Sequence, residues 1–245
     1  MSEESVRIKK KFRHTWISVL VICIMLPLVL AASRYFGNRR YYLCSILLII
    51  FSMVPFFLSF EKRKPEAREI VTLAVMCAIA VASRAAFIMV PHFKPMVGIV
   101  IITGMAFGAE AGFLTGAVSG FVSNFLFGQG PWTPWQMFAF GIAGFLAGLL
   151  AKAGIIKGAK KVSAAIFGGA VVLCIVGPLL DTSTLFTVST AITKESAAAV
   201  YLSGLPVNAV HALATALTIL LLGRPVTEKL DRIRIKYGMM EEDEV

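Results

Sequence analysis

The residues best suited to recognise a ligand lie in one stretch, NFLFGQGPWTPWQ, at positions 124–136. Its glycines and prolines predict a short, stiff loop, because proline fixes φ and glycine supplies turn conformations. Trp132 and Trp135 offer flat apolar faces, and binding sites commonly combine such walls with a few polar groups. The polar groups here are Asn124, Gln129 and Gln136. The loop therefore predicts a lid over a ligand, although two tryptophans are equally typical of the aromatic belt at a membrane surface.

Three polar side chains fall inside long apolar segments, where such groups are costly unless they are paired or functional. Asn208 and His211 are three residues apart, which places them on one face of a helix. Arg84 stands near the end of its segment, so its long side chain could instead reach the membrane surface. A lone histidine in a helix is more often a hydrogen-bonded packing residue than a ligand.

Further polar residues are expected in the loops at the same side of the chain. His92 and Lys94 fall in the first of these loops, and Asp181 is expected to begin the last one. Together with the tryptophan loop and the in-segment polar groups, they predict an outward-facing cavity for a polar or amphipathic molecule.

Catalytic signatures do not occur in the sequence. There is no GxxxxGK[ST], HExxH or GxSxG motif, so the chain is expected to be neither an ATPase of that type nor an enzyme. The four cysteines each stand alone in an apolar run, which predicts no disulfide framework and no metal site. They are Cys23, Cys44, Cys77 and Cys174. No intrinsic cofactor is expected.

Small residues recur four apart in several segments, a spacing that forms one smooth face on a helix. One such stripe is Ala74, Ala78 and Ala82. In a membrane a small-residue face lets another helix approach closely, so the stripe predicts either internal packing or docking of a separate protein. Glycines at 112, 116 and 120 predict a helix-packing face on the segment 111–127, and glycines at 144 and 148 predict one on the segment 134–151.

The elements that must position these residues are membrane-spanning helices. Of 245 residues, 58% are hydrophobic and 16% are charged, against about 25% charged residues in globular chains. About 20 apolar residues cross a bilayer as a helix, and open sheet edges cannot face lipid. We therefore predict an all-α membrane protein with eight spans, at residues 16–32, 41–60, 70–90, 96–107, 111–127, 134–151, 162–180 and 197–222.

The basic residues set the expected orientation and organisation. With both termini in the cytoplasm, 18 of the 24 Lys and Arg residues fall on the cytoplasmic side, as the positive-inside rule requires. The net charge of +10 therefore indicates membrane orientation and not nucleic-acid binding. We expect a helix pair at 1–60, a cytoplasmic linker at 61–69, a six-helix substrate-binding core at 70–223 and a cytoplasmic tail at 224–245.

Residues 68–225 resemble the substrate-binding S component of energy-coupling factor (ECF) vitamin transporters of prokaryotes. The resemblance rests on six helices of this length pattern, on the alanine stripe, and on FGAEAGFLTGAVSGFVSNFLFGQGPWTPWQMFAFGIAGFLAGLL. The GPWTPWQM loop is similar to S components assigned to cobalamin-type substrates. The first two helices depart from the six-helix family unit.

The resemblance implies a multi-pass protein of the cell membrane that captures a vitamin outside and delivers it inward. Its partners would be an ECF transmembrane coupling protein, docked on the alanine stripe, and two ATPase subunits that hydrolyse ATP. His92 and Lys94 would lie in a gate loop. The implied substrate-binding residues are Arg84, Asn124, Gln129, Trp132, Trp135, Gln136, Asp181, Asn208 and His211.

Two other functions stay open. A stand-alone secondary transporter or permease is disfavoured by the scarcity of carboxylates within the spans, since ion-coupled transporters commonly use them. A membrane scaffold without a small ligand would leave the tryptophan loop without a binding role.

Overall fold

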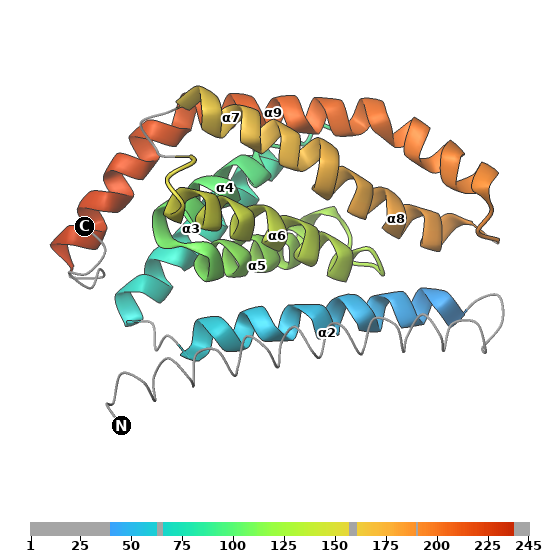
Figure 1. Ribbon diagram of the computed structural model, residues 1–245, viewed down its shortest axis with the longest axis horizontal. Coiled ribbons are helices and arrows are strands. Elements are labelled where there is room, and N and C mark those ends of the chain that lie inside the picture. Colours follow the sequence, from blue (N-terminus) through green and yellow to red (C-terminus); the bar gives the residue numbers. More distant parts are fainter. Residues whose placement is uncertain (1–39, 63–65, 157–160, 190, 238–245) are drawn as a thin grey trace. The chain divides into compact units, whose positions relative to one another are not determined.

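The computed structural model describes residues 40–62, 66–156, 161–189 and 191–237, and these residues form helices and no strands. Figure 1 shows the helices in chain order. They are α2 (Arg40–Lys62), α3 (Ala67–Ala86), α4 (Met96–Phe107), α5 (Ala109–Phe127), α6 (Thr133–Lys152), α7 (Lys161–Val171), the π-helical turn η1 (Val172–Val176), α8 (Gly177–Val188) and α9 (Lys194–Lys236). The all-helical prediction is confirmed for this part of the chain, and the expected span at 16–32 lies outside it.

The chain divides into two compact units, residues 1–55 and 56–245. Of the first unit, the structure describes only the part of α2 that begins at Arg40 and ends at Pro55. The second unit contains every helix from α3 to α9. Four of its helices are long and apolar enough to cross a membrane: α3, α6, the continuous helix 162–188 and α9.

The second unit is built around α4, which packs against α3, α5, α6, α7 and α9. Eleven of its twelve residues are buried. A helix that is apolar on every side belongs inside a bundle. At about 18 Å it is also shorter than the ~30 Å hydrocarbon core of a bilayer. Neighbouring helices therefore shield α4 from lipid.

A single glycine joins α4 to α5. Gly108 has φ 90° and ψ 178°, a backbone conformation that residues with a Cβ rarely adopt. The expected turn at 108–111 is thus shorter than predicted, and α5 already begins at Ala109.

Glycines set the close packing of α5 on α6, as the sequence predicted. A Cβ on Gly112 would collide with the Gly144 carbonyl, and one on Gly144 would collide with the Gly112 carbonyl. Gly116 meets the Phe140 backbone and Gly148 meets the Ala109 backbone in the same way. The two helices therefore touch through their main chains, the contact that small-residue faces permit.

The two predicted C-terminal spans are longer than expected. The helix that starts at Lys161 continues through η1 and α8 to Val188, so Asp181 lies within a helix and not at the start of a loop. Pro178 has no N–H to give to the carbonyl four residues earlier, and the π turn absorbs the change, with Gly177 N–H bonded to Val172 O.

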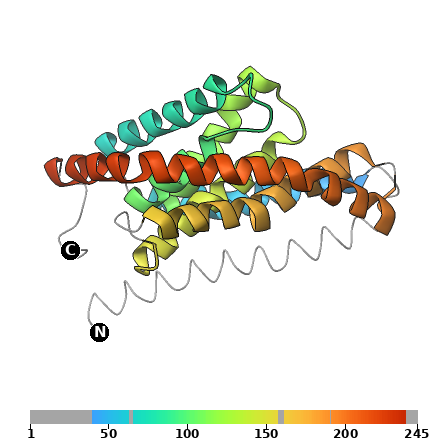
Figure 2. The same cartoon turned by 90° about the horizontal axis from the view of Figure 1, so that it is seen from above.

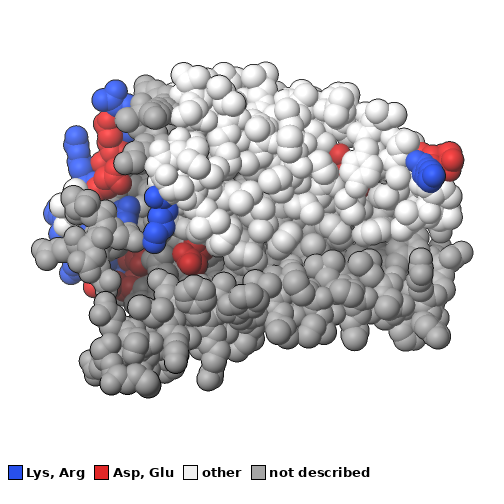
Figure 3. All heavy atoms as spheres, in the orientation of Figure 1, with Lys and Arg blue, Asp and Glu red and all other residues white. Residues whose placement is uncertain are grey.

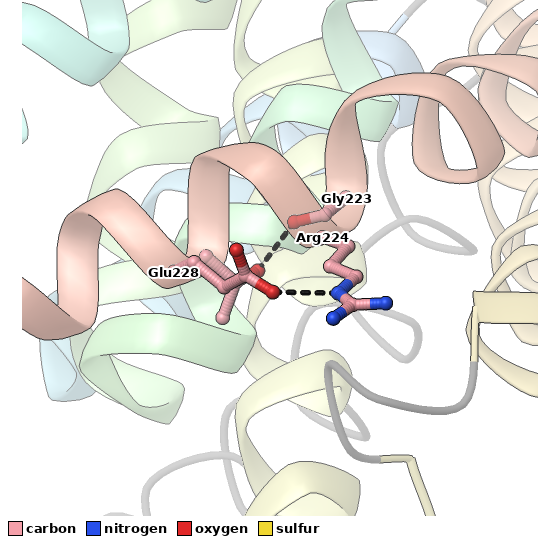
Figure 4. Close-up of polar contacts among 4 residues, drawn as sticks. Gly223, Arg224 and Glu228 are labelled. Carbon is pink, nitrogen blue, oxygen red and sulfur yellow. Dashed lines mark hydrogen bonds and ion pairs between the residues drawn. The ribbon is translucent and has the colours of Figure 1, made fainter.

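The last helix, α9, runs for 43 residues through Gly204, Pro206 and Pro225. In the sequence, Gly204 and Pro206 interrupt the segment 197–222 and predict some loop at its start; this prediction is wrong, because the helix continues through both residues. Figures 1 and 2 show α9 extending beside α7 and α8. Near its C-terminal end, Arg224 Nε bonds Glu228 Oε1 at 2.5 Å and Thr227 Oγ1 donates to Gly223 O at 2.7 Å (Figure 4). Both contacts join residues one turn apart, on either side of Pro225.

Charged side chains gather at the two ends of the face shown in Figure 3, and the surface between them is almost entirely uncharged, with one small acidic spot. Most of the Lys and Arg residues lie at the end where α9 finishes and α3 begins. An uncharged band flanked by charged ends suits a protein that crosses a bilayer.

Candidate functional site

Helices α3, α5 and α6 are tied together by a chain of buried hydrogen bonds, and we call this region the Thr133 end. The Arg84 guanidinium, on α3, donates through Nη1 to Ser123 Oγ and to Asn124 Oδ1 (3.1 Å), both on α5. Asn124 Nδ2 in turn donates to Thr133 Oγ1 at 3.0 Å, on α6. Asn124 is 1% exposed and Arg84 is 5% exposed. Arg84 therefore does not extend to the membrane surface.

The loop between α5 and α6 is held by side-chain hydrogen bonds within the loop and to its flanking helices. Thr133 Oγ1 donates to Gln129 Oε1 at 2.9 Å and accepts the Gly130 N–H at 3.2 Å. Gln129 Nε2 donates to Phe121 O, and Trp132 Nε1 donates to Gly128 O. Gln129 and Trp132 are both exposed. The loop is therefore rigid, and its exposed face presents an indole and an amide.

The second tryptophan points inward. Trp135 is 7% exposed, and its ring centroid lies 5.8 Å from that of Phe186 on α8. Contact with a ring from another helix is the environment of an internal aromatic wall, and a membrane-belt residue would face the lipid headgroups instead. Of the two tryptophans, Trp135 thus has the position that the lid or site interpretation requires.

Two cations flank one ring at the Thr133 end. Arg84 Cζ lies 4.3 Å from the Phe127 ring centroid, and Lys94 Nζ lies 5.4 Å from the same centroid. Burial lowers the pKa of Lys94 from its ordinary 10.5, and the nearby positive charge of Arg84 lowers it further. The loop before α4 that carries Lys94 also carries His92, which is exposed and has φ 60°.

A second polar pair joins α8 to α9. Asn208 Nδ2 donates to Asp181 Oδ2 at 2.8 Å. Each of these side chains packs on a glycine of the opposite helix: a Cβ on Gly177 would overlap the Asn208 amide, and one on Gly204 would overlap the Asp181 carboxylate. The two glycines therefore make room for polar side chains between two membrane helices.

Several buried polar atoms have no hydrogen-bond partner among the described residues. They are Arg84 Nε, Ser119 Oγ, Gln136 Oε1, His211 Nε2 and Thr215 Oγ1. His211 is 8% exposed, stands edge-on to Phe140 with centroids 6.4 Å apart, and lies within electrostatic range of Lys94 and Arg84. An unsatisfied buried polar group costs about 1–3 kcal/mol, so the open Arg84, Gln136 and His211 atoms are positions at which a polar ligand or water would gain hydrogen bonds.

The alanine stripe lies on the opposite side of α3 from its buried face. Ala74, Ala78 and Ala82 are all exposed. The buried residues of the helix are Glu69, Leu73, Met76, Cys77, Ala80 and Arg84. The described residues therefore do not support internal packing, which was one of the two interpretations of the stripe.

The structure places the predicted site residues in separate small groups and adds other residues to them. Arg84, Asn124 and Gln129 share one network, Asp181 and Asn208 form a pair, and His92 stands apart in its exposed turn. Sequence reasoning missed Ser123, Phe127, Thr133 and Phe186. The only signal for Thr133 was its place between Trp132 and Pro134, where a hydroxyl at a helix start can satisfy free N–H groups.

A family model described as "ECF-type riboflavin transporter, S component" matches residues 64–228. No curated protein and no solved structure matches the chain. The matched stretch holds every helix from α3 to α8 and most of α9, which agrees with the resemblance seen in the sequence at 68–225. The chain therefore belongs to the ECF-type riboflavin transporter S component family, whose members are membrane-embedded, non-catalytic, substrate-binding subunits.

Proposed function

We propose that the chain captures a vitamin or related micronutrient from outside the cell and delivers it inward as part of an ECF-type ABC importer. The observation that carries the proposal is the set of buried, unpartnered polar atoms within the bundle, of which Arg84 Nε belongs to the Thr133 end and His211 Nε2 lies within electrostatic range of Arg84. Polar groups that are left open inside an apolar bundle are ready to bind a polar ligand. Family membership supplies the class of ligand.

The proposed ligand-binding residues are those around these open atoms. Arg84, Gln136 and His211 would supply hydrogen bonds, Trp135 an apolar wall, and the Asp181–Asn208 pair a second polar contact. Asn124 and Gln129 would hold the loop in place, with Trp132 above it and His92 and Lys94 in the gate loop. The transported vitamin is the only ligand that this function needs, and no intrinsic cofactor takes part.

Eight spans with both termini in the cytoplasm are proposed for the whole chain. The distribution of basic residues supports this orientation, because the charge-rich end of the second unit would then face the cytoplasm. The Thr133 end would face outward in the cell membrane of a prokaryote, where a vitamin arrives.

The proposed partners are an ECF transmembrane coupling protein and two ATPase subunits, which would carry out ATP hydrolysis. The exposed stripe of Ala74, Ala78 and Ala82 supports this part of the proposal, because small residues allow a partner helix to approach closely. The stripe is flanked by exposed apolar side chains such as Val71, Val75 and Ile79.

Two substrates are the first to test. Riboflavin is the vitamin named in the family description. Cobalamin is the second candidate, because the GPWTPWQM loop is similar to that of S components assigned to cobalamin-type substrates. Mass spectrometry of the small molecule that co-purifies with the detergent-solubilised chain would identify the ligand directly. A protein that stays empty after incubation with a vitamin panel would contradict the proposal and favour a permease or a scaffold.

The partner surface can be tested separately from ligand binding. Ala78→Trp should abolish co-purification with the ATPase module and spare vitamin binding, because an indole keeps a partner helix away. Ala199→Trp, at an exposed alanine of α9, is the matched control and should assemble normally. Equal loss of vitamin binding and assembly in Ala78→Trp would show that the stripe does not act as a docking face. Uptake that persists without any ATPase and stops with ionophores would establish a secondary transporter.

A further inference from the structure

Arg84 and Lys94 bring two positive charges to one ring in a region with little solvent. Both lie against Phe127, at 4.3 Å and 5.4 Å from its centroid, so their charges are no further apart than the sum of those distances. Arg84 is only 5% exposed. A buried charge is stable only when it is paired or well hydrogen-bonded.

The described partners of Arg84 carry no charge. Its Nη1 donates to the Ser123 hydroxyl and the Asn124 amide oxygen, while Nε is buried without a partner. The Phe127 ring offers only the weak attraction of its π face. Lys94 likewise has an aromatic neighbour and a cationic one. The region therefore holds an excess of positive charge.

No carboxylate among the described residues is paired with either cation. Glu69 begins the same helix as Arg84, fifteen residues or about 22 Å away along its axis, and Glu110 begins α5, at the opposite end from Asn124. Asp181 is held by Asn208 on α9. Glu195 is exposed in the first turn of α9. An anion brought in by a ligand would therefore be stabilised at this position.

His211 adds a third group to the same region. It lies within electrostatic range of both Lys94 and Arg84, is more than nine-tenths buried, and leaves Nε2 without a partner. The three groups come from α3, the loop before α4 and α9. Convergence of two cations and an open imidazole nitrogen is the chemistry that binds a phosphate, whose oxygens accept several hydrogen bonds at once.

We propose that Arg84 and Lys94 form a subsite for a phosphate group of the transported vitamin, with His211 Nε2 lining it. The inference rests on the proposed function and deepens it from vitamin binding to binding of a phosphate-bearing vitamin. Cobalamin contains a phosphodiester, whereas riboflavin contains no phosphate and gains one only as its 5′-phosphate. The subsite thus separates the two candidate vitamins by charge.

The test uses the full chain in lipid nanodiscs and pairs of compounds in which one member carries the anionic group and the other lacks it. Cobinamide lacks the rest of the nucleotide loop as well as the phosphodiester, so for that pair the decisive readout is how the substitutions change the affinity ratio. The pairs are riboflavin 5′-phosphate with riboflavin, cobalamin with cobinamide, and pantothenate with pantothenol as a carboxylate pair. Isothermal titration gives the affinity ratio within each pair. The variants are Lys94→Gln, Lys94→Arg and Arg84→Gln, and the control is Lys194→Gln, at an exposed lysine at the start of α9.

We expect the wild type to prefer the phosphate-bearing member of at least one pair. Lys94→Gln and Arg84→Gln should each reduce that preference by roughly tenfold or more, as loss of a charge-assisted hydrogen bond does. Lys94→Arg should retain most of it, and Lys194→Gln all of it. Thermal unfolding of each variant identifies any loss that comes from misfolding, and Lys94→Gln, in a loop, keeps the test available if Arg84→Gln does not fold.

Three results would overturn the inference. Equal binding of both members of every pair, unaffected by the substitutions, would leave vitamin binding intact and remove the phosphate subsite. An Arg84- and Lys94-dependent preference confined to pantothenate would assign the subsite to a carboxylate instead. A folded wild type that binds none of the six compounds would overturn the proposed function together with this inference.

Discussion

At the scale of single residues, Thr133 holds the Thr133 end together. Its hydroxyl takes part in three hydrogen bonds, with Asn124 on α5, Gln129 in the loop and the Gly130 N–H. Asn124 in turn accepts from Arg84. The position of the buried guanidinium therefore depends on one small hydroxyl two residues before Trp135.

Thr133→Val removes that hydroxyl and nearly preserves the volume of the side chain. Because Asn124 Nδ2 is then buried without a partner, we expect unfolding to become easier by about 2 kcal/mol and vitamin affinity to fall. Denaturant titration in detergent and vitamin titration measure the two effects. Thr184→Val is the control, since Thr184 is exposed and bonds only the Leu180 carbonyl of its own helix. Equal effects of the two substitutions would contradict a special role for Thr133.

Lys94 gives the site a pH dependence with opposite signs for stability and for binding. Its pKa is lowered in the folded protein by burial and by the charge of Arg84. Between that lowered pKa and the unfolded value of 10.5, the unfolded chain therefore holds more protons. Stability should therefore rise as pH rises through the lowered pKa. Affinity for a phosphate-bearing ligand should fall over the same range, because Lys94 loses the charge that attracts it.

The measurement is the difference between wild type and Lys94→Gln, which cancels the titration of other groups. Unfolding by denaturant and titration of riboflavin 5′-phosphate are each followed from pH 7 upward. The variant should lack both trends. A binding curve that falls equally in wild type and variant would assign the pH effect to another group.

The sequence predicted which polar residues belong to the site, but it did not predict their hydrogen-bond partners. Asn124, Gln129 and Arg84 stood out because polar groups in apolar segments are expensive. Thr133 and Ser123 did not, since threonine and serine can satisfy themselves on their own helix backbone. Only the fold shows that Thr133 instead bonds across to α5.

At the scale of elements, the crossing of α8 over α9 depends on two glycines. Gly177 lies under the Asn208 amide and Gly204 under the Asp181 carboxylate. The glycine on each helix leaves room for the polar side chain of the other helix. The two helices can therefore bury a hydrogen-bonded pair and still pack closely.

Gly177→Ala should push Asn208 away from α8 and weaken its hydrogen bond to Asp181. We expect a loss of about 1–3 kcal/mol in unfolding free energy, as for other overpacked interiors, with weaker vitamin binding. Gly169→Ala, in α7, is the matched control. A Cβ there meets its nearest atoms at 3.8 Å and 3.9 Å, and alanine favours a helix over glycine. Destabilisation by Gly169→Ala of similar size would show that glycine packing at Gly177 is not specific.

The sequence predicted the presence of the helices better than it predicted where each helix begins and ends. The predicted segment at 96–107 agrees with α4, because Pro95 directly precedes the helix and Gly108 directly follows it. The loop expected near Gly204 and Pro206 is absent because α9 continues through both residues. A broken helix within lipid would expose backbone groups that cannot be satisfied there, and this cost outweighs the local preference of proline and glycine.

At the scale of the whole molecule, the charged end of α9 and the Thr133 end give the second unit a direction. Lys194 and Lys229 are exposed near opposite ends of α9. If the proposed orientation holds, the first faces outward and the second faces the cytoplasm.

Cysteine labelling in intact cells tests this orientation. In a background without the four native cysteines, Lys194→Cys should react with a membrane-impermeant maleimide, and Lys229→Cys should react only after the cells are permeabilised. Labelling of both positions after permeabilisation confirms that each thiol is accessible. The reverse pattern in intact cells would overturn the proposed topology.

The burial of α4 has a consequence for how the protein is made. This helix is too short to cross the bilayer alone, and one of its covering neighbours is α9, which follows it in the chain only after α5, α6, α7 and α8. Its final surroundings therefore do not exist until α9 has been synthesised. Insertion of the helices before α9 and completion of the core are thus separate events in the making of the protein.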